Sequence, residues 1–349
     1  MRNFTFKGLF LEVVFIVLGS LSIQAADGDL ITKQITIKLE EAGTLPSKIG
    51  DTKKYKITNL KIMGEINGTD LCFIREMAGS DREGWRTEGK LATLDLSGAK
   101  IVRGGGIYYN SVNCYTSDDV IGNYAFSGCC SLTSLILPSN VTSIGYSAFY
   151  GCIRLTSLTL PSSVTSIDGR AFYGCSSLFG LTLPSSVTSI GSSAFEACYG
   201  LFSLTLPSSV TEIGESAFRG CSGLTSLTLP SSVTSIGKSA FEGCSGLTSI
   251  YVSWESPLSI DASTFKDANT GKCILYVPKG TYDDYWLSNW GIFENIVEYD
   301  ATGIDHITTS GEAKEISRYA ADGQRLEVPA KGLNIVKYSD GSVKKVVVQ

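Results

Sequence analysis

A fixed interval of 23 residues between similar segments constrains this chain more than any other feature of its sequence. The repeated unit is LxxLxLPxxVxxIGxxAFxxCxx, and its most regular copies run through residues 132–252. A period in the twenties is typical of a solenoid, in which each repeat forms one coil and buries its apolar side chains against neighbouring coils. Two columns of the unit keep the interval: Phe126, Phe149, Phe172, Phe195, Phe218 and Phe241, and Cys129, Cys152, Cys175, Cys198, Cys221 and Cys244.

Each part of the unit predicts its own local structure. The LxxLxL part alternates with a period of two, which predicts a short strand with its leucines inward, and the proline after it ends the strand. The AFxxC part has one-turn helical spacing and directs Phe and Cys into the core. Gly191 is expected to have a positive φ, with Asp168 as a tolerated substitute in its own coil. We therefore predict an α/β leucine-rich repeat solenoid, with a parallel strand ladder and short helical turns.

The N-terminus has the features of an export signal. Arg2 and Lys7 supply positive charge, an apolar stretch covers residues 9–18, and Ala25 and Ala26 offer a cleavage point. The apolar stretch is shorter than the roughly 20 residues that a membrane-spanning helix needs. We expect a protein that is exported to the outer cell surface or secreted, with no transmembrane segment once the signal is removed.

The rest of the chain divides by composition and pattern. The C-terminal segment is rich in charge, has short alternating stretches, and carries turn residues at Asp322-Gly323 and Asp340-Gly341, which predicts a small β domain. The predicted domains are a signal peptide (1–26), an N-terminal lead-in or cap (27–54), the solenoid (55–299, with an insertion at about 102–120) and the C-terminal β domain (300–349).

The repeats resemble the BspA-like leucine-rich repeat family of bacterial surface proteins, whose hallmark is a 23-residue unit with an AFxxC segment. The resemblance covers about residues 55–299, and residues 275–280 look like the end coil of that family. It implies attachment to host or matrix proteins, or to other cells. The tail, with Gly323–Leu326, Lys331–Val336 and Lys345–Val348, is similar to sorting domains of the type IX secretion pathway. It is either an address for the outer surface or a structural end piece.

One feature departs from ordinary leucine-rich repeats. Their inward asparagine ladder survives at most as Asn140, and serines stand at the matching place in the later coils. The backbone groups that such a ladder satisfies must therefore find other partners. These serines are Ser163, Ser186, Ser209 and Ser232.

Composition argues against several classes of protein. With 29 basic against 34 acidic residues, the chain does not have the charge of a nucleic-acid binder. His306 is the single histidine, which nearly excludes mechanisms that need two histidines. Zinc is not expected without a CxxC pair or clustered histidines, and Gly104–Gly106 is interpreted as a flexible stretch of the insertion. We predict no catalytic, cofactor-binding or metal site, and we do not expect an enzyme.

The ten cysteines fall into two groups. Six occupy one inward position of successive coils, where Cys acts as a small apolar residue, so a reduced ladder is favoured. Pairing between adjacent coils is left open, because neighbouring thiols would lie within bonding range. Cys72, Cys114, Cys130 and Cys273 lie outside the ladder and are the better candidates for disulfides in an exported protein.

Differences between near-identical units indicate positions where packing does not dictate the residue. The position after the ladder Phe is Tyr150, Tyr173, Glu196, Arg219 and Glu242 in successive coils. Exposed aromatic side chains are enriched at binding surfaces, although these tyrosines could equally cover the insertion or vary neutrally. The candidate binding surface consists of Tyr146, Tyr150, Tyr173, Phe179, Tyr199 and Phe202.

These observations predict a cell-surface or secreted binding protein. An adhesin-like module would contact host or matrix proteins, or other cells, through the solenoid surface. A glycan-binding surface protein and a scaffold without a tight ligand are the alternatives, and catalysis ranks last because no base, nucleophile or metal cluster is apparent.

Overall fold

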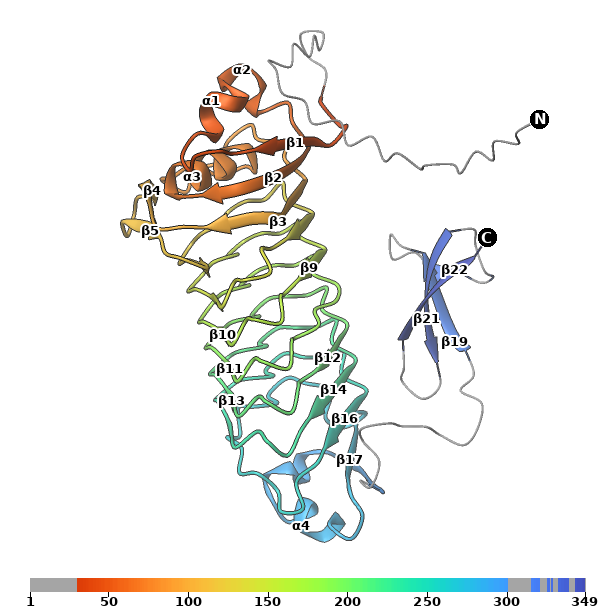
Figure 1. Cartoon of the computed structure of the whole chain (residues 1–349). Helices are drawn as coiled ribbons and strands as arrows, with labels where there is room; N and C mark the ends of the chain where they lie inside the picture. Colours follow the sequence, from red (N-terminus) through yellow and green to blue (C-terminus); the bar gives the residue numbers. More distant parts are fainter. Residues whose placement is uncertain are drawn as a thin grey trace, which may run out of the picture. The chain divides into compact units, whose positions relative to one another are not determined.

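The computed structural model describes residues 30–300 and, beyond them, residues 315–320, 325–326, 328, 332–338 and 343–348. The predicted signal peptide and the predicted turns at Asp322-Gly323 and Asp340-Gly341 lie outside the described residues. The chain divides into two compact units, Met1–Leu181 and Thr182–Gln349, which we describe separately (Figure 1).

The first unit is built on a five-stranded parallel sheet with the order β1-β2-β3-β7-β9 (Figure 1). Each repeat strand pairs with the strand of the next coil in register, so that Leu94, Leu135 and Leu158 form one buried row. This ladder confirms the predicted solenoid. Its strands are β1 (Ile35–Lys38), β2 (Asn59–Ile66), β3 (Thr93–Ile101), β7 (Ser134–Ile136) and β9 (Ser157–Thr159).

The parallel sheet begins before residue 55, where the solenoid was expected to start. β1 lies within the expected lead-in, and its Ile35 and Ile37 pair with Leu60 and Ile62 of β2. The segment ITIK alternates like the repeat strands, which explains why it joins the sheet. The lead-in therefore contributes a strand as well as two short helices, α1 (Leu45–Ile49) and α2 (Asp51–Lys54).

Two residues within the VxxIG part of each repeat form a short strand, and these strands make a second ladder. In the first unit, the buried Ile121, Ile144 and Ile167 end its strands and lie beside one another. The strands are β6 (Val120–Ile121), β8 (Ser143–Ile144) and β10 (Ser166–Ile167).

The insertion forms an antiparallel hairpin that packs on helix α3 (Gly68–Met77). The helix begins with a capping box: the Asn67 side chain accepts a hydrogen bond from Thr69 N, and Asp70 accepts one from Asn67 N. A Cβ on Gly105 would lie 2.4 Å from Asn67 Oδ1, so the glycine run lets the hairpin approach the helix closely. It is part of a strand rather than the flexible stretch that we expected. The hairpin strands are β4 (Gly104–Tyr109) and β5 (Cys114–Thr116).

The second unit repeats this architecture and closes with an end coil. Its parallel sheet has the order β12-β14-β16-β17-β18, and β11, β13 and β15 form the ladder of short strands. In the end coil Trp290 is fully buried, and its Nε1 donates a hydrogen bond to Leu258 O at 2.8 Å. The elements are β11 (Ser189–Ile190), β12 (Ser203–Thr205), β13 (Glu212–Ile213), β14 (Ser226–Leu229), β15 (Ser235–Ile236), β16 (Ser249–Val252), β17 (Ile274–Pro278), α4 (Tyr282–Trp286), the 3-10 helix η1 (Asn289–Ile292) and β18 (Asn295–Tyr299).

The ladder phenylalanines stack inside both units. The ring centroids of Phe149 and Phe172 are 5.0 Å apart in the first unit, and those of Phe195 and Phe218 are 5.2 Å apart in the second. All six ladder phenylalanines are at most 1% exposed. Stacked aromatic rings of this kind add to the apolar burial that holds each coil to the next.

The left-handed residue of each unit is not the glycine that we predicted. The structure places the positive φ two residues later, at Ser193 (φ 56°) in the coil of Gly191. The glycine has a different purpose, which its equivalent Gly214 shows: a Cβ there would lie 2.5 Å from Ser192 N of the neighbouring coil. The glycine is therefore needed because the coils approach closely, and the turn itself is made by a serine.

Hydroxyl groups replace the missing asparagine ladder. Ser209 Oγ donates a hydrogen bond to Val187 O of the preceding coil at 2.6 Å, and Ser232 Oγ donates to Val210 O at 2.8 Å. Ser163 makes the equivalent bond to Val141 O in the first unit. A short side chain thus satisfies the backbone carbonyl that would otherwise be left without a donor.

The described part of the tail is a four-stranded antiparallel sheet with the order β20-β19-β21-β22. It forms the small C-terminal β domain that the alternating pattern predicts, and Val336 is buried in it. The strands are β19 (Glu315–Ala320), β20 (Arg325–Leu326), β21 (Gly332–Tyr338) and β22 (Val343–Val348).

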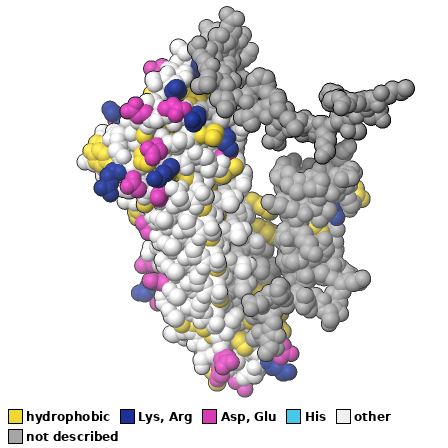
Figure 2. All heavy atoms as spheres, in the orientation of Figure 1, with side chains coloured by type: hydrophobic (Ala, Val, Ile, Leu, Met, Phe, Trp, Pro, Cys, Tyr) yellow, Lys and Arg dark blue, Asp and Glu magenta, His cyan; other side chains and the backbone are white. Residues whose placement is uncertain are grey.

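Charged side chains are unevenly distributed over the face shown in Figure 2. They gather over the N-terminal helices and strands of the first unit and over the end coil of the second. The repeats of each unit present mainly uncharged polar side chains and backbone on this face. Among the residues that the structure describes, no helix is both long enough and apolar enough to span a membrane.

Candidate functional site

We call the position after the ladder Phe the varied position. Tyr150 and Tyr173, two predicted site residues at this position, lie side by side in the first unit. Their rings stack with centroids 5.0 Å apart and planes 10° apart. Tyr150 is 42% exposed, whereas Tyr173 is half-buried. The stacking follows from the 23-residue step, because equivalent side chains of adjacent coils stand one strand spacing apart.

Three more tyrosines continue this aromatic surface. Tyr109, at the end of β4, stacks on Tyr124 with centroids 4.7 Å apart and planes 5° apart. Tyr124 in turn meets Tyr146 edge to face, with centroids 5.7 Å apart. The insertion thus contributes Tyr109 to the aromatic surface. Its ring stacks on Tyr124, so the tyrosines do not simply cover the insertion.

These side chains line an open groove with a volume of about 370 Å³, which we call the tyrosine groove. Gly128 and Gly151, two glycines with positive φ, are among the residues that line it. The groove has both apolar ring surface and polar groups. Its lining residues are Gly84, Tyr109, Tyr124, Ser127, Gly128, Tyr146, Ser147, Tyr150, Gly151 and Arg170.

The wall that carries Tyr109 is held in place by helix α3. Gly106 N of the hairpin donates a hydrogen bond to Thr69 Oγ1 at 3.0 Å. The neighbouring Tyr108 is 1% exposed, and its hydroxyl donates to Asn123 O at 2.8 Å. The groove is therefore built on packed elements, which keeps the ring positions fixed.

A buried cation lies behind this wall. Arg75 of α3 is fully buried, and its guanidinium carbon is 5.0 Å from the centroid of the Tyr109 ring. Its Nη1 donates to Tyr124 O at 2.6 Å, and its Nη2 donates to Ser80 Oγ at 3.1 Å and Asp81 O at 2.9 Å. Its Nε has no hydrogen-bond partner among the described residues. Every partner of this charge is neutral.

Two lining residues occupy an unusual place in the repeat. Tyr124 (φ 58°) and Arg170 (φ 55°) stand at the left-handed position, where the other repeat coils have serine. Large side chains seldom adopt this conformation without a compensating reason. Both exceptions lie in the groove, which marks this stretch of the solenoid as different from the rest.

The other predicted site residues lie outside the groove. Phe179 is 42% exposed on the strand side of its coil in the first unit. Tyr199 is 55% exposed and Phe202 is half-buried, both in the second unit. The groove thus takes Tyr146 and Tyr150 from the predicted set, with Tyr173 stacked on Tyr150.

Sequence reasoning missed four residues of this region. Tyr109 and Arg75 come from parts of the chain outside the regular repeats, so their approach is not encoded in the 23-residue interval. Tyr124 and Arg170 were detectable from the sequence, because each stands where most repeats have a serine. Comparison at that position, in addition to the one after Phe, would have found both.

In the second unit the varied position carries charge. Arg219 lies between Glu196 and Glu242, with N···O distances of 3.5 and 3.6 Å. The pKa of Glu242 is lowered by a hydrogen bond from Ser239 and by the charge of Arg219. We call Glu196, Arg219 and Glu242 the charged row.

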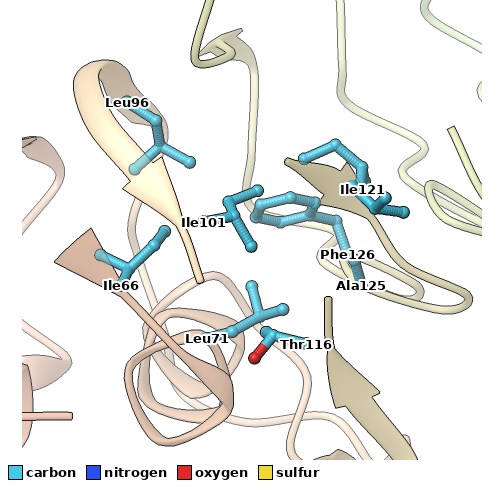
Figure 3. A pocket seen from close by; sticks show the side chains of 9 residues that line it. Ile66, Leu71, Leu96, Ile101, Thr116, Ile121, Ala125 and Phe126 are labelled. Atoms are coloured by element: carbon cyan, nitrogen blue, oxygen red, sulfur yellow. The ribbon is translucent and has the colours of Figure 1, made fainter. Parts of the chain in front are cut away.

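One enclosed cavity lies in the core beneath the hairpin, where Leu71 of α3, Ile101 of β3 and Phe126 point toward one another (Figure 3). Its volume is about 10 Å³, enough for a single water at most, and its lining is almost wholly apolar. It is a gap between packed elements and not a ligand site.

No disulfide joins any of the ten cysteines, all of which lie in the described part of the chain. The six ladder cysteines are fully buried, and Cys152 Sγ donates to Phe126 O at 3.1 Å, as Cys221 Sγ does to Phe195 O. Burial raises the pKa of Cys129 to about 12, which favours the unreactive thiol form. Cys72, Cys114, Cys130 and Cys273, which we considered for disulfides, are unpaired. The described residues contain no cluster of three His, Cys, Asp or Glu side chains that could hold a metal ion.

The sequence and fold were compared with known proteins. The family described as the BspA type leucine rich repeat region matches residues 109–209 and 192–281, in six copies. No curated protein matches the sequence.

Several solved structures of bacterial leucine-rich repeat proteins are similar. One, from T. pallidum, is 40% identical, with 38% of this chain and 64% of that chain covered and a TM-score of 0.37. A second, from Bacteroides ovatus, is 31% identical, with 46% and 44% covered and a TM-score of 0.40. A leucine rich cell surface protein from Faecalibacterium prausnitzii is 20% identical, with 77% and 88% covered and a TM-score of 0.27. The chain therefore spans less than two thirds of the first two proteins.

Proposed function

This chain belongs to the proteins that carry a BspA-type leucine-rich repeat region, and from that premise we propose that it is a cell-surface or secreted binding protein. It acts as an adhesin-like module that contacts host or matrix proteins, or other cells, through the solenoid surface. The observation that carries this proposal is the tyrosine groove, where four tyrosines from different parts of the first unit converge.

The chemistry of the groove supports binding. Tyrosine offers a large contact area with few rotatable bonds, so little side-chain entropy is lost when a partner binds. The groove is open and built on packed coils, so a partner meets rings whose positions are already fixed. This open shape suits contact with an extended ligand better than the enclosed site that most reactions need.

Export completes the proposed function. Residues 1–26 have the pattern of a signal peptide, and the tail resembles a sorting domain that would deliver the chain to the outer surface. Both features agree with a family of bacterial surface proteins. The tail is proposed here as an address rather than as part of the binding surface.

A glycan is the second candidate partner, favoured by the mixed lining of the groove. Tyrosine rings with their phenol hydroxyls and the charged Arg170 line the groove, and a sugar has both an apolar C–H face and polar hydroxyl edges. A scaffold without a tight ligand is the third candidate.

Binding of the purified chain to a panel of extracellular-matrix proteins and polysaccharides tests the proposal. A Tyr146→Ala, Tyr150→Ala variant is expected to lose saturable binding to the partner found in the panel. Tyr282→Ala in α4 is the matched control, because this tyrosine is 41% exposed and lies outside both the groove and the predicted binding surface, and it is expected to bind as the unchanged chain does. Equal binding by all three proteins would contradict the groove as the contact site.

A further inference from the structure

We propose that the tyrosine groove is a site for a carboxylated sugar, whose acid group pairs with Arg170 and whose ring packs against the tyrosines. This inference rests on the proposed function, because it takes the groove as the contact site of the protein. It adds the chemical class of the ligand.

The charge of the groove is the first argument. Arg170 is the single charged residue among the ten that line it, and none of the ten carries a carboxylate. Arg170 is exposed, and none of the ion pairs among the described residues includes it. A guanidinium that faces a groove without a counter-ion is suited to bind a carboxylate through two parallel hydrogen bonds.

The buried charge behind the wall is the second argument. The guanidinium of Arg75 faces the Tyr109 ring, and all of its hydrogen-bond acceptors are carbonyl or hydroxyl oxygens. No carboxylate hydrogen-bonds to it among the described residues, so no ion pair at hydrogen-bond distance offsets its positive charge. A charge in such surroundings is screened less than one in water, and its field favours an anion in the adjacent groove.

The arrangement of the rings is the third argument. Tyr109 and Tyr124 are parallel, whereas Tyr146 meets Tyr124 at an interplanar angle of 67°, so the rings form a corner. One wall of such a corner can cover the C–H face of a sugar while the phenol hydroxyls reach its edge. The volume of about 370 Å³ is at the lower end of the range for small-molecule sites.

The repeat itself supplies the fourth argument. Arg170 replaces the serine that stands at the equivalent place in four other coils, at Ser147, Ser193, Ser216 and Ser239. The backbone at this position has the same left-handed conformation in all five coils, so the fold does not require an arginine. The arginine therefore changes the charge of the surface at this coil without being needed for the backbone conformation.

Calorimetric titration of the full chain with pairs of saccharides tests the inference. The first pair is trigalacturonic acid and its methyl ester, which keeps the sugar rings and removes the charge. The second pair is sialyllactose and lactose, which distinguishes a sialic acid from a uronic acid as the natural source of the carboxylate. For at least one pair, the acid is expected to bind about tenfold more tightly or better than its neutral partner, as a charge-assisted hydrogen bond implies.

Two matched variants separate the groove from general charge effects. Arg170→Ser introduces the residue of the sibling coils and is expected to remove the preference for the acid, so that both members of the pair bind equally. Arg219→Ser removes a charge from the charged row outside the groove and is expected to keep the full preference. An unchanged preference in Arg170→Ser, or equal binding of acid and neutral forms by the unaltered chain, would overturn the inference.

Failure of this inference differs from failure of the proposed function. If neither saccharide pair binds, but a matrix protein binds and is lost in the Tyr146→Ala, Tyr150→Ala variant, the ligand is a protein and the carboxylated sugar is ruled out. If every partner binds that variant as well as the unaltered chain, the groove itself is not the site and both proposals fail.

Discussion

The position after the ladder Phe has opposite chemistry in the two units. In the first unit Tyr150 and Tyr173 stack, with ring centroids 5.0 Å apart. In the second, Arg219 bridges Glu196 and Glu242 at N···O distances of 3.5 and 3.6 Å. The backbone makes the same hydrogen bonds in both cases: Gly128 N donates to Tyr150 O, and Ala197 N donates to Arg219 O.

This difference shows how the solenoid separates folding from surface chemistry. Within each unit the interval of 23 residues brings equivalent side chains together, whatever those side chains are. Like residues then stack and opposite charges pair, so either solution is compatible with the fold. The residue one place earlier, always Phe, has no such freedom because it is buried.

The largest expected effect concerns that buried neighbour. Phe149→Ala and Phe218→Ala should each lower the free energy of unfolding by about 3–5 kcal/mol, because each leaves a cavity between stacked rings. Tyr150→Ala, one residue away, should cost no more than about 1.5 kcal/mol, which is the worth of a stacked pair. Urea unfolding of the three variants measures these differences. A loss for Tyr150→Ala as large as that for Phe149→Ala would show that the varied position is structural.

The second prediction compares the buried arginine of the first unit with the exposed one of the charged row. Arg75→Met should cost about 2–4 kcal/mol, because the Tyr124 and Asp81 carbonyls lose their donor in the interior. Arg219→Met removes a half-exposed ion pair and should cost no more than about 1 kcal/mol. Thermal unfolding of both variants at one ionic strength is the measurement. Equal losses of stability in the two variants would mean that the hydrogen bonds of Arg75 contribute no more than the exposed ion pair.

The third prediction uses the residue that follows the varied position. Ala197 (φ 60°) stands where the other five coils with a ladder Phe have a left-handed glycine, such as Gly174 (φ 71°). Ala197→Gly should raise the free energy of unfolding by about 0.5–1 kcal/mol, and Gly174→Ala should lower it by about 1 kcal/mol. A Cβ on Gly174 has no neighbour closer than 3.9 Å, so the backbone conformation accounts for the whole effect. Opposite signs in chemical unfolding confirm this, whereas two losses would point to packing around Ala197.

The smallest expected effect is a pH dependence confined to the charged row. The hydrogen bond from Ser239 and the nearby Arg219 lower the pKa of Glu242. A carboxyl with a lowered pKa stabilises the folded state above its ordinary pKa of about 4.3, and this contribution disappears as the pH falls through the folded-state value. The difference in stability between the unaltered chain and Glu242→Gln should therefore shrink on acidification. A difference that grows on acidification would contradict the sign.

The repeats could be predicted from the sequence because their interval fixes which residues become neighbours. The Phe and Cys columns, the inward leucines and the parallel ladder all follow from it. Gly191 was misassigned because a repeated glycine suggests a positive φ, whereas here it permits close contact between coils. β1 was missed as a sheet strand because a short alternating segment outside the repeat does not by itself identify its neighbours.

The candidate site was only half predictable for the same reason. Tyr146 and Tyr150 belong to the repeat, so their neighbours can be counted along the chain. Tyr109 reaches the groove through a hairpin, and Arg75 through a helix, and both depend on packing between segments far apart in the sequence. Arg170 lies within the repeat, but its position forms a turn in every coil, so nothing in the pattern indicated that it lines a groove.

The ladder of buried thiols gives the solenoid a built-in set of reporters. Each of the six ladder coils carries one Cys that is 0% exposed, and the Sγ atoms of Cys152, Cys175, Cys221 and Cys244 each donate to a carbonyl of the coil before. A thiol-specific reagent can therefore reach a given cysteine only when that coil opens. The order in which Cys129 through Cys244 become labelled would trace, coil by coil, where the stack first comes apart.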